Sequence, residues 1–99
     1  MPFQPVGRWH IQISDPIGTQ IWLDCYPNGA FQSQRLRMGV TDHAAGQWAF
    51  NPYTQTLQLQ GYIDGYQPFM HGIMINGPQG NGYFGAGSDG FPYFLIRMP

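Results

Sequence analysis

The chain has 99 residues and combines 14 glycines, 9 prolines and 16% aromatic residues with only 9% charged residues. Its formal net charge is −1 and all four of its cations are arginines. Nucleic acids and anionic membranes are bound through clustered cations, so this composition excludes both as expected partners. A chain of this length forms one domain, predicted over residues 1–99 with an extended N-terminal segment at 1–6.

Cysteine content and the N-terminus indicate the compartment. Cys25 is the single cysteine, so no internal disulfide can form. The first residues lack the basic start and apolar run of a signal peptide, and no apolar stretch approaches the roughly 20 residues that span a bilayer. We therefore expect a cytoplasmic protein. Its low charge gives little colloidal repulsion, which favours a homo-oligomer.

The first half of the chain predicts four strands. Trp9, Ile11 and Ile13 alternate with polar residues, as in a strand with one buried face, so a first strand is predicted over about 8–14. Turn residues at 15–18 and the hairpin signal Pro27-Asn28-Gly29 delimit a second strand. The expected elements are strands at 19–26 and 30–38, a longer loop at 39–46 and a short strand at 47–50.

The second half continues the same pattern. Leu57, Leu59 and Ile63 share one face of a fifth strand, predicted over 56–63. A sixth strand follows Pro68, and a glycine-dense turn is expected at 76–82. Strands at 83–87 and 91–98 complete the set. No segment has a sustained 3.6-residue apolar period, so crossover helices are not expected.

Eight sequential strands with hairpin-length links predict an all-β fold. Closure into an eight-stranded antiparallel up-and-down β-barrel removes the exposed edges, and its interior holds side chains or one small ligand. An open sandwich or a domain-swapped sheet of the same strands is the alternative.

Three positions carry a family resemblance. Gly7 and Trp9 on the first strand, with Arg97 on the last, resemble the calycin pattern of lipocalins, avidins and bacterial metalloprotease inhibitors. The resemblance implies a lipocalin- or streptavidin-like barrel in which Trp9 plugs one end and Arg97 stacks across its indole. The chain is shorter than most members and lacks the other conserved boxes of the lipocalins. Avidin's biotin-contacting residues cannot be mapped onto it, so biotin binding is not implied.

Polar or aromatic residues on the predicted inward faces are candidate ligand contacts. The structural interpretation is that some strand faces are misassigned, or that these side chains form hydrogen bonds with one another near the rim of the barrel. The functional interpretation is a few polar contacts in a mostly apolar pocket. The candidates are Ser33, Arg35, Phe69, His71, Tyr83 and Tyr93.

No catalytic, cofactor or metal-binding motif is present. Cys25 and the three histidines do not share a metal-like spacing, so a buried structural cysteine is expected. Asp42 and His43 form an acid–base pair or part of a solvated loop.

The predicted function is a non-catalytic binding module that encloses a small apolar or amphipathic molecule, at the barrel end far from Trp9. One alternative is a protein-interaction or protease-inhibitor module that uses residues 1–5 or exposed aromatics. Trp22, Tyr26, Trp48 and Tyr62 are the aromatics considered, as a subunit contact or a carbohydrate platform. The other alternative is a small enzyme that uses the barrel cavity.

Overall fold

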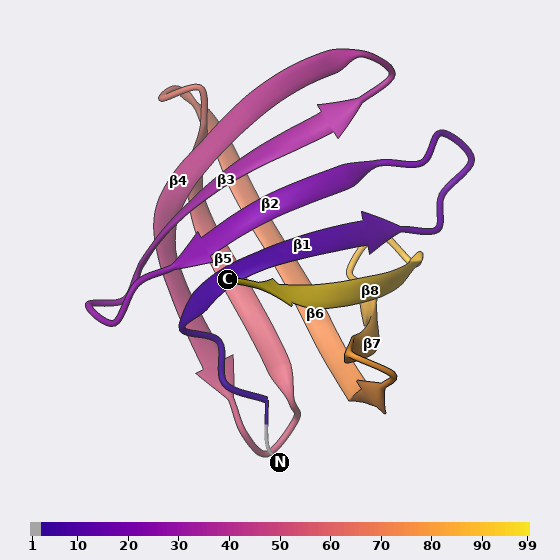
Figure 1. Cartoon of the computed structure of the whole chain (residues 1–99). Helices are drawn as coiled ribbons and strands as arrows, with labels where there is room; N and C mark the ends of the chain where they lie inside the picture. Colours follow the sequence, from indigo (N-terminus) through magenta and orange to yellow (C-terminus); the bar gives the residue numbers. More distant parts are fainter. Residues whose placement is uncertain (1–2) are drawn as a thin grey trace.

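The computed structural model describes residues 3–99 as one closed barrel. Eight strands follow one another around it in chain order, each antiparallel to its neighbours, and the last pairs with the first (Figure 1). The predicted all-β, eight-stranded up-and-down barrel is confirmed. The strands are β1 Gly7–Ile13, β2 Gln20–Cys25, β3 Ala30–Arg37, β4 Val40–Asn51, β5 Thr56–Ile63, β6 Gln67–Gln79, β7 Gly82–Gly87 and β8 Pro92–Met98. Residues 3–99 contain no helix with the length and hydropathy needed to cross a membrane.

The loop predicted at 39–46 is wrong, because β4 begins at Val40. Met38 and Gly39 both have positive φ, of 52° and 76°, as the tightest two-residue hairpin turns require. This turn leaves the whole of 40–47 free to pair with β3, from Val40 opposite Arg37 to Gln47 opposite Ala30. The polar residues of this segment suggested a loop, but they belong to a strand with one face toward solvent.

The turn predicted at 76–82 is also longer than the one observed. β6 continues to Gln79, which pairs with Gly82, and the register shifts between Ile75 and Gly77. Gly77 has a φ of 155°, which accommodates the extra residue of a β-bulge. Gly77 therefore lies at a bulge within a strand, and the turn itself is limited to residues 80 and 81.

Trp9 fills one end of the barrel. Its side chain is fully buried, and its indole Nε1 donates to the carbonyl oxygen of Pro5 over 2.9 Å. The guanidinium carbon of Arg97 lies 4.2 Å from the ring centroid. Gly7 has a φ of 131°, and a Cβ there would lie 2.3 Å from Nη1 of Arg97. The backbone conformation therefore favours glycine, and any larger residue would also displace the Arg97 guanidinium from its place over Trp9.

Phe3 closes the same end from inside, and the residues that follow it are bound to the barrel. Phe3 is 4% exposed, and its ring stacks on Trp9 with centroids 4.9 Å apart. Arg97 donates to the carbonyl oxygens of Gln4 and Val6, both over 2.7 Å. From Phe3 onward, the segment that the inhibitor hypothesis would project into a partner is thus attached to its own barrel. Met1 and Pro2 lie outside the described residues.

Candidate functional site

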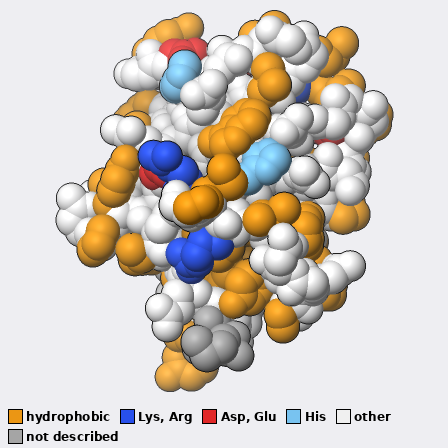
Figure 2. Space-filling view, in the orientation of Figure 1, with side chains coloured by type: hydrophobic (Ala, Val, Ile, Leu, Met, Phe, Trp, Pro, Cys, Tyr) orange, Lys and Arg blue, Asp and Glu red, His pale blue; other side chains and the backbone are white. Residues whose placement is uncertain are grey.

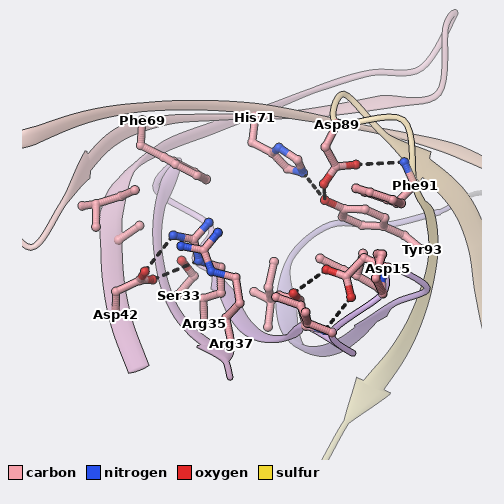
Figure 3. A pocket seen from close by; sticks show the side chains of 17 residues that line it. Asp15, Ser33, Arg35, Arg37, Asp42, Phe69, His71, Asp89, Phe91 and Tyr93 are labelled. Atoms are coloured by element: carbon pink, nitrogen blue, oxygen red, sulfur yellow. Dashed lines mark hydrogen bonds and ion pairs between the residues drawn. The ribbon is translucent and has the colours of Figure 1, made fainter. Parts of the chain in front are cut away.

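A pocket of about 440 Å³ opens at the end of the barrel opposite Trp9. It lies among the links β1–β2, β3–β4, β5–β6 and β7–β8 and the strand ends that they join (Figure 3). Isoleucines and aromatic rings form its apolar walls, and carboxylates, guanidinium groups and one imidazole reach into it. The lining residues are Ile13, Asp15, Pro16, Ile17, Thr19, Ile21, Ser33, Arg35, Arg37, Asp42, Ala44, Ile63, Phe69, His71, Asp89, Phe91 and Tyr93.

Five of the six predicted contacts line this pocket, namely Ser33, Arg35, Phe69, His71 and Tyr93. The structure does not bring Tyr83 to them. Its ring lies 5.1 Å from Phe3 and 6.0 Å from Trp9, at the opposite end. Alternation along a strand identifies the face of a residue but not its height in the barrel, and Tyr83 is near the start of β7.

Sequence reasoning missed the polar residues contributed by hairpin ends. Asp15, Arg37, Asp42 and Asp89 all line the pocket. Their positions beside the predicted hairpins could have identified them, because in an up-and-down barrel alternate hairpins gather at the same end. Each of these residues lies within a few positions of such a hairpin.

An ion pair forms one wall of the pocket. Arg35 and Asp42 are directly opposite on β3 and β4. Nε of Arg35 donates to Asp42 Oδ1 over 3.1 Å, and Nη2 donates to Oδ2 over 2.7 Å. Strand alternation turns His43 to the outer face, where its side chain is exposed. Asp42 and His43 therefore do not form the acid–base pair considered from the sequence.

His71, on the facing wall, belongs to a directional hydrogen-bond chain. Tyr93 donates its only hydroxyl proton to Asp89 Oδ2 over 2.6 Å. Its oxygen must then accept from His71 Nε2, which lies 2.7 Å away. In the neutral imidazole Nδ1 is then the unprotonated nitrogen, and it accepts from Ser88 Oγ over 3.2 Å. The bonds together define one neutral tautomer.

Burial favours the same neutral state. It lowers the pKa of His71 below its ordinary value of 6.5, and the nearby charge of Asp89 opposes this only in part. Burial and the bond to Asp89 also raise the pKa of Tyr93 well above its ordinary range. Both ring nitrogens of His71 are engaged, so proton transfer to a ligand would require one of these bonds to break.

Charge is concentrated at the pocket. The nine charged residues of the chain include five that line it: Asp15, Arg35, Arg37, Asp42 and Asp89. Asp15 accepts from the backbone nitrogen of Thr19 over 2.9 Å, and its bonds to Thr19 lower its pKa. Four of the five charges are thus engaged by neighbours. Arg37 makes no hydrogen bond or ion pair within residues 3–99, and Figure 3 shows it on the same wall as Arg35.

The aromatic residues and the cysteine considered from the sequence lie away from the pocket. Trp22, Tyr26 and Tyr62 lie outside the core, whereas Trp48 packs against it and donates its indole Nε1 to the carbonyl oxygen of Tyr26 over 2.8 Å. Cys25 is buried. Within residues 3–99, no three His, Cys, Asp or Glu side chains are grouped as a metal site requires.

Comparison of the chain with protein-family models, curated proteins and solved structures finds no match. Any functional assignment therefore depends on the geometry of the barrel and its pocket.

Proposed function

We propose that the protein binds a small amphipathic molecule in the pocket opposite Trp9 and does not transform it. The observation that carries the proposal is the concentration of charge there. In a chain with so few charged residues, five of nine converge on one mostly apolar hollow. Apolar walls with a few oriented polar groups are typical of small-molecule sites.

Arg37 indicates what chemical group the polar end of the ligand carries. Asp15, Asp42 and Asp89 already accept hydrogen bonds from neighbouring residues, and Arg35 is held by Asp42. Arg37 retains its donors, so it favours a ligand with an acidic or strongly accepting group near β3. The apolar body of the ligand would lie against Ile21, Ile63 and Phe69.

A matched pair of fluorescent probes tests both parts of the proposal. Anilinonaphthalenesulfonate and N-phenylnaphthylamine share their ring system, but only the first carries an acidic group. The folded protein is expected to bind both, and the sulfonate more tightly. Arg37→Gln should weaken sulfonate binding by about tenfold, the effect of losing one charge-assisted hydrogen bond, and leave the neutral probe unaffected.

Arg8→Gln is the control, because Arg8 is an exposed arginine on the outer face of β1. It should change neither affinity. Failure of the folded protein to bind either probe would overturn the pocket assignment. Equal effects of the two arginine variants would overturn the role of Arg37.

A further inference from the structure

A second hollow lies mainly on the outside of the barrel across β1 to β5, has a volume of about 800 Å³ and shares only Ser33 and Ala44 with the pocket. Strand register arranges its side chains in two rows. One row runs through Arg8, Asp24, Gln32, Ala45 and Tyr62, which are successive cross-strand partners. The other runs through Trp22, Gln34 and His43. The small Ala45 leaves the hollow between the two aromatic residues.

The two aromatic residues of the hollow lie on strands that are three apart. Trp22, on β2, stacks on His10 with ring centroids 5.1 Å apart and planes inclined by 18°. His10 is itself bonded to Gln20 over 2.9 Å, so the indole is held in a fixed orientation. Tyr62, on β5, is 56% exposed. Three strand spacings, roughly 15 Å, separate the backbones of β2 and β5 on which the two residues lie.

The groups between them have unused hydrogen-bonding capacity. The side-chain amides of Gln32 and Gln34 and the indole N–H of Trp22 make no hydrogen bond within residues 3–99, although Trp9 and Trp48 both find acceptors. Each amide offers an acceptor and two donors. Arg8 and Asp24 neutralise one another over 2.7 Å, so the carboxylate of Asp64, which accepts from the backbone nitrogen of His43 over 3.3 Å, is the remaining formal charge of the hollow. Figure 2 shows the charged side chains of the face turned to the viewer in isolated places, among hydrophobic and uncharged polar groups.

From this arrangement we infer that the outer hollow binds a neutral oligosaccharide. The C–H faces of a sugar ring carry partial positive charge and pack on the negative face of an aromatic ring. Its hydroxyls need neutral groups that donate and accept at once, which amides provide. The lining has one arginine and two aspartates, so the hollow gives no electrostatic attraction for an anionic chain. The separation of Trp22 and Tyr62 suits a chain of a few sugar units rather than a monosaccharide.

Titration of the ¹⁵N-labelled protein with cellotriose, maltotriose, triacetylchitotriose and mannotriose tests the inference. At least one trisaccharide should bind in the millimolar range and shift the Trp22 indole and the Gln32 and Gln34 side-chain resonances. Tyr62→Ala should weaken this binding by about tenfold. Tyr53→Ala should leave it unchanged, because Tyr53 is 95% exposed in the β4–β5 turn, outside the hollow. Both are surface truncations, and circular dichroism checks that each variant is folded.

Three results would overturn the inference. The first is the absence of saturable shifts with all four sugars, and the second is binding that Tyr62→Ala leaves intact. The third is a dimer, detected by sedimentation, that Tyr62→Ala dissociates while no sugar binds, since a second copy of the chain would then occupy the hollow. Arg37→Gln should not alter sugar binding, which keeps this test independent of the interior pocket.

Discussion

Arg97 joins the last strand to the first by covering Trp9. Its guanidinium carbon lies 4.2 Å from the indole centroid, and its nitrogens hold the carbonyl oxygens of Gln4 and Val6. One side chain therefore provides a cation–π contact and fixes the segment that precedes β1. The residue remains exposed, so part of its charge stays hydrated.

Removal of the Arg97 guanidinium should destabilise the barrel at the end that Trp9 fills. Arg97→Met is expected to lower the free energy of unfolding by about 1–2 kcal/mol, through loss of the cation–π contact and the two bonds. Urea denaturation measures the change, and Trp9 fluorescence should shift to the red. Arg8→Met is the control, because its exposed ion pair with Asp24 contributes little. Equal stability of the two variants would contradict this role for Arg97.

Phe3 should contribute more to the stability of the fold than its position near the chain end suggests. Phe3→Ala removes a buried ring that contacts Trp9, Phe50 and Tyr83, and should cost about 3 kcal/mol of stability because a cavity remains. Chemical denaturation compared with Tyr53→Ala, at an exposed aromatic position, gives the measurement. A loss no larger than that of the control would mean that the N-terminal segment does not close the barrel in solution.

The burial of His71 predicts a pH dependence of stability. Its pKa is lowered in the folded state, so the unfolded chain binds the extra proton more readily and stability rises with pH. The melting temperature should therefore fall as pH drops through 6.5, the ordinary histidine value, and level off below the folded pKa. His71→Gln should flatten this fall.

His43→Gln provides the comparison for that experiment, because the His43 side chain is exposed on the outer face. Its melting curve between pH 8 and 5 should follow that of the unaltered protein. An identical pH profile for all three proteins would refute the role of His71.

Cys25 should be unreactive while the protein is folded. It is 2% exposed, and burial raises the pKa of its thiol to about 12, so almost no thiolate is present near neutral pH. Labelling with dithionitrobenzoate should be negligible in buffer and complete in guanidinium chloride. An added thiol at the exposed position of Tyr53, in Tyr53→Cys, should react at once. Rapid labelling of the native single cysteine would show that the barrel opens there.

The sequence determined the fold class because its signals are local. Period-two alternation, as in Trp9, Ile11 and Ile13, assigns faces, and turn chemistry such as Pro27-Asn28-Gly29 assigns hairpins. Eight antiparallel strands joined by short links then have few arrangements other than a closed barrel. The same alternation placed Ser33, Arg35, Phe69, His71 and Tyr93 on the inner face.

Tertiary structure decided what local patterns cannot encode. The height of each side chain along the barrel depends on register across several strands, which separates Tyr83 from the pocket and brings Asp89 into it. The polar segment 40–46 became a strand because a two-residue turn at Met38 and Gly39 aligned it with β3. Phe3 entered the core because closure of the barrel left one end for it to fill. Each outcome depends on contacts between residues distant in sequence, and such contacts exist only once the barrel has closed.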